Sequence, residues 1–267
     1  MPKLYIMTDY EGVSGIDEWD DRSSTDAVAC AKRLRHRRLC TGEINAAVDG
    51  ALDAGFDHVL VNDAHGGGRM LLVEDIHPRC LLFRGAKRPT WLAELDGSYD
   101  AAVFIGAHAM ADTPRATLSH TFSKGVKEWQ WCGSSIGEIG ATVLGAAAMG
   151  VPTVCVSGGE LACREAEELV PGIVTAPVKK DVSELSAVHM PPPAARELIR
   201  ERVAEGLSKL GEIEPLGFGE PPYTFRIELR EPAFSASAGR EGMRVIDGCT
   251  VEYSGDEPLA VMKDAIY

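Results

Sequence analysis

The sequence predicts an α/β fold, with a mainly parallel central sheet flanked by helices and a smaller C-terminal α+β lobe. Two observations support this prediction. Short runs of Val, Ile and Leu are almost continuously apolar, which is typical of parallel strands that are buried on both faces. Up to about residue 190 these runs alternate with helix-like segments, as in chains built from strand-helix-strand units.

The predicted elements follow in order along the chain. Strands are predicted over residues 4–8, 58–62, 81–83, 101–105 and 153–156, and helices over 26–54, 137–149 and 160–169. Gly55 is a suitable stop for the long first helix. Residues 117–122 and 126–132 are rich in β-forming residues and are separated by Lys124 and Gly125, which predicts a hairpin.

The composition changes near residue 190. Three prolines at 191–193 favour the start of a helix over 194–210. β-rich stretches follow at 223–229 and 243–253, and a short helix is predicted from Asp256. We therefore expect a larger α/β domain over residues 1–190 and a smaller α+β lobe over residues 191–267.

The charge balance argues against nucleic acid as a partner. The 267-residue chain has 27 Lys and Arg against 40 Asp and Glu, a formal net charge of −13. Phosphate-binding surfaces need clustered basic residues instead. The basic residues within 32–38 would point to several sides of one helix, so we interpret them as a solvated or subunit-contacting face.

Neither a disulfide framework nor a membrane partner is predicted. The seven cysteines form no CxxC pair, and several, such as Cys155, lie in apolar strand-like runs, which favours core thiols in a reducing cytoplasm. No signal-peptide pattern precedes the first strand. Gly145, Gly150 and Pro152 interrupt the uncharged stretch 140–159, so we interpret it as a buried helix, a turn and a core strand.

Polar side chains follow the predicted strands where each strand ends. Asp9 and Glu11 follow the first strand, and residues two apart in an extended segment project to the same side. His65 follows the second strand and His108 the fourth. Because the carboxyl ends of parallel strands meet at one edge of the sheet, we expect these four side chains to lie together.

Glu138 adds a third carboxylate at the start of a predicted helix, where a negative charge is favoured. Carboxylates in close proximity repel each other unless a proton or a cation lies between them. Mixed His, Asp and Glu ligands suit zinc, and a shared carboxylate suits a site with two metal ions. The joint pattern therefore predicts a metal site.

Each of these residues alone is more typical of an ordinary structural position. A single histidine is more often a surface or hydrogen-bonded core residue, and Asp-x-Glu is often a solvated turn. Asp63 is either a turn cap or a partner of the neighbouring His65. The remaining histidines are interpreted as structural: His36, His58, His77 and His189.

A second set of motifs suggests a serine esterase. His65-Gly66-Gly67-Gly68 matches the HGGG oxyanion loop, and residues 133–137 match GxSxG with Ser135 as the nucleophile between a strand and a helix. That fold needs an acid and then a histidine late in the chain, yet the last histidine is His189. The esterase would also leave Asp9 and Glu11 without a role, so it ranks second.

Together these residues resemble peptidase family M55, the zinc-dependent D-aminopeptidases. The family signature Ser-x-Asp-x-Glu-Gly is similar to residues 7–12, with Met7 in place of the serine. Similar motifs occur at 61–65, 105–109, 119–120 and 136–140, and the resemblance extends to about residue 205.

The resemblance implies a centre with two zinc ions per chain. Asp9 would be the shared carboxylate, and His120 would be the catalytic histidine outside the metal ligands. The remaining ligands would be Glu11, His65, His108 and Glu138.

The implied activity is removal of an N-terminal D-amino acid from short peptides or aminoacyl amides by a zinc-activated water. The resemblance also implies a homo-oligomer, expected as a decameric ring with its sites facing the interior. Residues 1–190 would then form the metal-binding catalytic domain, and the lobe 191–267 would be a candidate for oligomerisation. A third interpretation is a metal-binding oligomer without catalytic activity.

Overall fold

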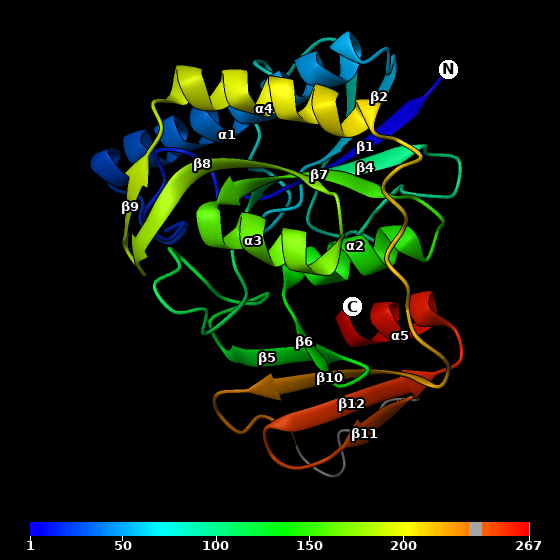
Figure 1. Cartoon of the computed structure of the whole chain (residues 1–267). Helices are drawn as coiled ribbons and strands as arrows, with labels where there is room; N and C mark the ends of the chain where they lie inside the picture. Colours follow the sequence, from blue (N-terminus) through cyan, green and yellow to red (C-terminus); the bar gives the residue numbers. More distant parts are fainter. Residues whose placement is uncertain (235–241, 267) are drawn as a thin grey trace.

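The computed structural model describes residues 1–234 and 242–266 and arranges them in successive layers (Figure 1). Two helices, α1 (Ala27–Asp53) and α4 (Pro192–Ser208), cover one face of a large sheet. The other face carries α2 (Glu138–Ala147) and α3 (Glu160–Leu169). A smaller sheet lies beyond α2. The last helix, α5 (Pro258–Ile266), contacts both this smaller sheet and α2.

The large sheet confirms the predicted fold class. Its seven strands have the order β3-β2-β1-β4-β7-β8-β9, and all neighbours are parallel except β8 and β9. They are β1 (Lys3–Thr8), β2 (His58–Asn62), β3 (Cys80–Phe83), β4 (Ala101–Ala107), β7 (Thr153–Gly159), β8 (Val174–Ser183) and β9 (Ser186–His189). The core forms around β1 and β4, whose side chains are almost all buried.

The smaller sheet is antiparallel, with the strand order β11-β12-β10-β5-β6. Its strands are β5 (Val126–Trp131), β6 (Ser134–Ile136), β10 (Tyr223–Leu229), β11 (Met243–Val245) and β12 (Thr250–Gly255). This sheet combines segments from before and after residue 190, whereas α4 packs against α1 beside the large sheet. The assignment of separate roles to residues 1–190 and 191–267 stays a prediction.

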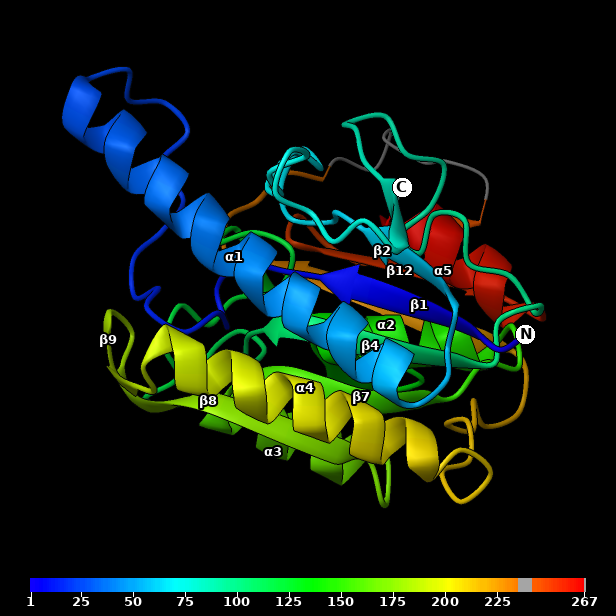
Figure 2. The same ribbon diagram turned by 90° about the horizontal axis from the view of Figure 1, so that it is seen from above.

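Helix α1 begins as its sequence predicts. The side chain of Asp26 caps it by accepting hydrogen bonds from the N–H groups of Val28 and Ala29 at 2.9 and 3.0 Å. The second half of α1 is buried against α4 and the large sheet, while the first half projects from the body of the molecule (Figure 2). Most basic residues of 32–38 lie on this projecting part.

The predicted hairpin between residues 117–122 and 126–132 is wrong. Leu118 and Phe122 have φ angles of 56° and 63°, which break an extended strand. Instead, β5 turns back through Cys132 and Gly133 to pair with β6. The strands β8 and β9 also lie outside the predicted elements.

The stretch 140–159 forms the remainder of α2, a turn and β7, as predicted. No helix in the described ranges combines the length and the apolar character that a bilayer crossing requires. Cys40, Cys155 and Cys163 are buried, in agreement with core thiols, but Cys30 and Cys132 are exposed because they lie on the projecting part of α1 and in the β5–β6 turn.

Candidate metal centre

Asp9 and Glu11 lie in the loop that follows β1, and this loop is bound to the end of β4. The N–H groups of Asp9 and Gly12 donate to the carbonyl oxygens of Ile105 and Gly106, both at 2.8 Å. The loop therefore takes its position from backbone contacts with the neighbouring strand, and both carboxylates are buried.

Two glycines make this close backbone approach possible. A Cβ atom on Gly12 would lie 1.9 Å from the carbonyl oxygen of Ala107, and one on Gly158 of β7 would lie 2.0 Å from the same oxygen. Any larger residue would separate the loop from β4. We call Gly12, Ala107 and Gly158 the backbone junction.

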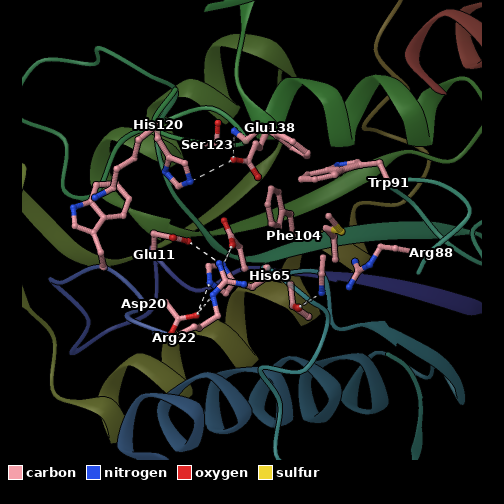
Figure 3. Close-up of a pocket in the computed structure, with 18 of the residues that line it drawn as sticks. Glu11, Asp20, Arg22, His65, Arg88, Trp91, Phe104, His120, Ser123 and Glu138 are labelled. Carbon is pink, nitrogen blue, oxygen red and sulfur yellow. Dashed lines mark hydrogen bonds and ion pairs between the residues drawn. The ribbon is translucent and has the colours of Figure 1, made fainter. Parts of the chain in front are cut away.

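His65 faces both carboxylates of the loop. Its Nδ1 lies 3.0 Å from Asp9 Oδ1 and 3.3 Å from Glu11 Oε2, so the two carboxylates do share one side. Its Nε2 lies 3.4 Å from Oδ2 of Asp20, which also pairs with Arg22. Asp20 thereby orients the imidazole ring with Nδ1 toward the centre (Figure 3).

His108 faces the second oxygen of Asp9. Its Nε2 lies 3.3 Å from Asp9 Oδ2 and 3.2 Å from Oε1 of Glu138, the first residue of α2. Its Nδ1–H donates to the carbonyl oxygen of Ala109 at 3.0 Å, which leaves the lone pair of Nε2 directed at the carboxylates. Phe122 fixes Glu138 by donating its N–H to Oε1 at 2.7 Å.

His120 lies beside this group on the wall of a cavity. Its ring stacks on His108 with centroids 4.1 Å apart, and its Nε2 is 3.9 Å from Glu138 Oε1. Nδ1–H donates to the Leu118 carbonyl oxygen at 3.0 Å, so Nε2 faces the centre. Trp19 packs edge-on against the ring, with centroids 5.2 Å apart.

The donor atoms fit a divalent cation. Asp9 Oδ2, Glu11 Oε2 and His108 Nε2 are buried and have no hydrogen-bond partner among the residues that the structure describes. Asp9, Glu11 and His108 each offer a ligand atom within 4.8 Å of the others, and so do His108, His120 and Glu138. Imidazole nitrogens and carboxylate oxygens are ligands that zinc accepts.

The pKa values reflect the crowding of these charges. Burial and the negative charge of Glu11 raise the pKa of Asp9 to about 7. Burial disfavours a charged His108, but Glu138 and Asp9 raise its pKa to about 10. His65 holds the pKa of Glu11 well below its usual range, although burial alone would raise it. Protons are thus retained between the carboxylates, and a cation would take their place.

A cavity of about 540 Å³ opens onto this group. Its wall is partly aromatic, with Trp19, Trp91, Phe104 and Phe122, and it carries cationic side chains (Figure 3). Arg22 lies beside His65, Arg88 lies on the side of Trp91, and Lys124 lies over the ring of Trp19. The cavity can accommodate a small polar ligand with an apolar part.

The structure brings all six predicted site residues together: five lie at the carboxyl ends of β1, β2 and β4 and at the start of α2, and His120 joins them from the irregular segment 117–122. Asp63 does not contact His65. Its carboxylate accepts hydrogen bonds from the N–H groups of Met70 and Leu71, both at 3.1 Å, as the turn-cap interpretation predicts. Asp20 takes the place beside His65 instead.

The geometry does not favour the esterase. Ser135 lies exposed within β6 and donates to Glu128, so it does not form a turn between a strand and a helix. His65 uses both ring nitrogens for contacts with carboxylates of the loop segments.

The sequence analysis missed several residues that support the centre. Lys179 of β8 is buried and its Nζ donates to the carbonyl oxygens of Glu11 and Ile16. Glu43 of α1 accepts a hydrogen bond from the N–H of Ser14 at 2.9 Å. Lys179 stands beside Lys180 and Asp181 in a strand of mixed burial, so no signal in the sequence distinguished it.

Comparison with known proteins identifies the family of the chain. The family model described as D-aminopeptidase, peptidase M55, matches residues 2–265. A D-aminopeptidase of Bacillus subtilis (strain 168) is 35% identical over 217 residues, which cover 80% of this chain and 77% of the relative. The solved structure of the Zn-dependent D-aminopeptidase DppA from Bacillus subtilis, a self-compartmentalizing protease, superposes with a TM-score of 0.91 at 29% identity, covering 99% of this chain and 95% of that one. The chain therefore belongs to peptidase family M55, the D-aminopeptidases.

Proposed function

We propose that the protein is a dizinc D-aminopeptidase that removes the N-terminal D-amino acid from short peptides or aminoacyl amides. One observation carries the proposal: the two carboxylate oxygens of Asp9 face two different imidazoles, His65 and His108. A carboxylate in this position can bridge two metal ions. The names of the similar proteins support zinc as the metal and the D configuration of the substrate.

The proposed ligands divide about Asp9. Glu11 and His65 would complete one zinc site, and His108 and Glu138 the other. When bound, the two ions would supply an acidified water molecule and polarise the carbonyl of the scissile peptide bond. Asp20, which contacts Nε2 of His65, would keep the imidazole ring oriented with its Nδ1 toward the zinc site.

His120 is proposed as the proton carrier. The Leu118 carbonyl holds its Nδ1–H, so the free Nε2 faces the cavity and can pass a proton to the leaving amine. In the balanced reaction, the water gives a proton to Nε2 of His120 as it adds to the carbonyl carbon, the C–N bond breaks, and His120 passes that proton to the departing amine. Burial and the nearby His108 lower the pKa of His120, which favours proton release.

The test combines metal analysis with turnover. Wild-type protein is expected to hold two zinc ions per chain and to hydrolyse D-alaninamide faster than L-alaninamide. Asp9→Asn should lose zinc and activity, while His120→Ala should retain zinc but lose about 10²–10⁴ in rate. Loss of zinc in His120→Ala would make it a ligand.

The same assay separates the alternatives. Activity that survives zinc removal but is lost in Ser135→Ala would indicate the esterase. Full zinc content without turnover of any D- or L-aminoacyl substrate would indicate a metal-binding oligomer. The decameric ring implied by the resemblance and the cytoplasmic location predicted from the cysteines stay proposals.

A further inference from the structure

Arg88 occupies a distinct part of the cavity, on the side of Trp91 and away from His120 (Figure 3). Its Nη1 lies 3.4 Å from Asn62 Oδ1, and its Nη2 donates to the carbonyl oxygen of Asp63. Asn62 is itself held, because its Nδ2 donates to the Trp91 carbonyl oxygen at 3.2 Å. The guanidinium is therefore fixed at the carboxyl end of β2, next to β1.

The glycine loop after His65 makes room for this guanidinium. A Cβ atom on Gly68 would lie 2.1 Å from Arg88 Nη2, and Gly68 has a φ of +61°. The loop that resembled an esterase oxyanion hole thus serves to admit an arginine side chain to the cavity.

Arg88 forms no salt bridge in residues 1–234 and 242–266. Its charge does act on the buried carboxylate of Asp63, but that carboxylate is already held by the N–H groups of Met70 and Leu71. Guanidinium remains charged at every relevant pH, and it is only partly exposed here. The other cations of the cavity differ: Arg22 pairs with Asp20 at 3.1 Å, and Lys124 is exposed above the ring of Trp19. A half-buried guanidinium that makes no direct ion pair is a favourable site for an anion.

We propose that Arg88 binds a carboxylate of the substrate, and that this is the C-terminal carboxylate of a very short peptide. The inference rests on the proposed function. We call residues 9–12, which carry Asp9 and Glu11, the ligand loop. Asn62, which Arg88 contacts, pairs with Met7, two residues before Asp9, so Arg88 lies about 7 Å along the strand direction from the ligand loop. An extended peptide of two or three residues spans at most about 7–11 Å.

The experiment compares substrates that differ in this carboxylate. Zinc-loaded wild-type enzyme should cleave D-alanyl-glycine with a kcat/KM about 10–100 times that for D-alanyl-glycinamide. Arg88→Met should remove this preference, so that the ratio of kcat/KM for the acid to kcat/KM for the amide falls to about 1–3. Arg88→Lys, which keeps the charge but not the planar fork, should keep part of the preference.

Lys87→Met is the matched control, since Lys87 is an exposed cation of the same loop outside the cavity. It should retain the full preference. Zinc content and Tm of every variant are measured alongside, so that Arg88→Lys can replace Arg88→Met if the latter is unfolded.

Equal cleavage of D-alanyl-glycine and D-alanyl-glycinamide by the wild type would overturn the proposal. A preference for the free acid that survives in Arg88→Met, or that disappears only in Lys124→Met, would also overturn it. A second pair of substrates, D-aspartamide and D-asparaginamide cleaved at the α-amide, tests whether the carboxylate that Arg88 binds belongs to the side chain of the N-terminal residue. An Arg88-dependent preference within this pair alone overturns the C-terminal assignment. Failure of the proposed function would look different, because neither member of any pair would be cleaved.

Discussion

Lys179 is a single buried charge that positions the ligand loop from a distant strand. It reaches the Glu11 carbonyl across 168 residues of sequence, and burial lowers its pKa to about 8. Asp9 and Glu11 could be predicted because their spacing is local. Lys179 and Asp20 could not, because their roles arise from contacts that only the folded chain creates.

Lys179→Met should loosen the ligand loop. Two carbonyl oxygens, of Glu11 and Ile16, would lose their donor inside the protein, so we expect the free energy of unfolding to fall by about 2 kcal/mol and zinc affinity to decrease. Urea denaturation and chelator competition measure the two effects. Lys180→Met, at an exposed neighbouring position, should change neither. Equal behaviour of the two variants would contradict the assigned role.

Asp20→Asn should weaken zinc binding without removing a ligand. The carboxylate that holds His65 Nε2 would lose its charge, and loss of such partners typically costs about 10–100-fold in metal affinity. Competition with a chromogenic chelator reports the change. The control is Asp21→Asn at the exposed neighbouring position, which should bind zinc with wild-type affinity. An equal loss of zinc affinity in Asp21→Asn would indicate a general disturbance of this loop rather than a role of Asp20.

Glu43 should make stability depend on pH. Burial raises its pKa from the usual 4.5 to about 8, so the folded state binds a proton that the unfolded chain releases. This stabilisation is complete below pH 4.5 and is lost as the pH rises to 8. In urea unfolding, the free energy of unfolding of the wild type should fall between pH 5 and 8. The fall in Glu43→Gln should be smaller than that in wild type by about 2 kcal/mol or more. The exposed Glu74, as Glu74→Gln, should track wild type throughout.

At the scale of elements, local signals predicted most strands and helices but not the segment 117–122. Asp26 and Gly55 bound α1 as their chemistry predicts. Leu118 and Phe122 adopt positive φ angles that their residue types disfavour, so no propensity could indicate them. This irregular segment carries His120 and the Phe122 N–H that binds Glu138, so the tertiary site determines its shape.

Gly12→Ala should disturb the contact between the β1 loop and β4. The added carbon would meet the Ala107 oxygen at 1.9 Å, and backbone cannot move aside as a side chain can. We expect a loss of about 3 kcal/mol or more in unfolding free energy, together with loss of bound zinc. Gly217→Ala is the control, because a Cβ there meets no atom within 4 Å. An unchanged Tm in Gly12→Ala would disprove the backbone contact.

At the scale of the whole molecule, the chain shares its fold with the Bacillus relative over 99% of its length. The α/β class could be predicted from the alternation of apolar strand-like runs with helix-like segments. The second sheet could not, because it joins β5 and β6 to strands about 90 residues later in the chain. That relative is described as self-compartmentalizing. The exposed Val28 and Leu34 on the projecting half of α1 are available for contacts between copies.

Light scattering should give a mass several times the 28.6 kDa of one chain. The ring that the resemblance implies would contain ten copies. If the sites face an enclosed interior, short D-peptides should be cleaved while a long peptide with the same N-terminal residue should not. A monomer, or equal cleavage of both lengths, would contradict the enclosed assembly.

The backbone junction of Gly12, Ala107 and Gly158 has a consequence for engineering. It joins the loop after β1 to β4 and β7 through main-chain contacts, which do not involve the side chains of Asp9, Glu11 and His108. The proposed ligands at positions 9, 11 and 108 could then be exchanged to alter metal selectivity, for example toward cobalt or manganese, while the main-chain frame is preserved. The useful positions for directed evolution are thus the ligands themselves, and the three residues of the junction should be left constant.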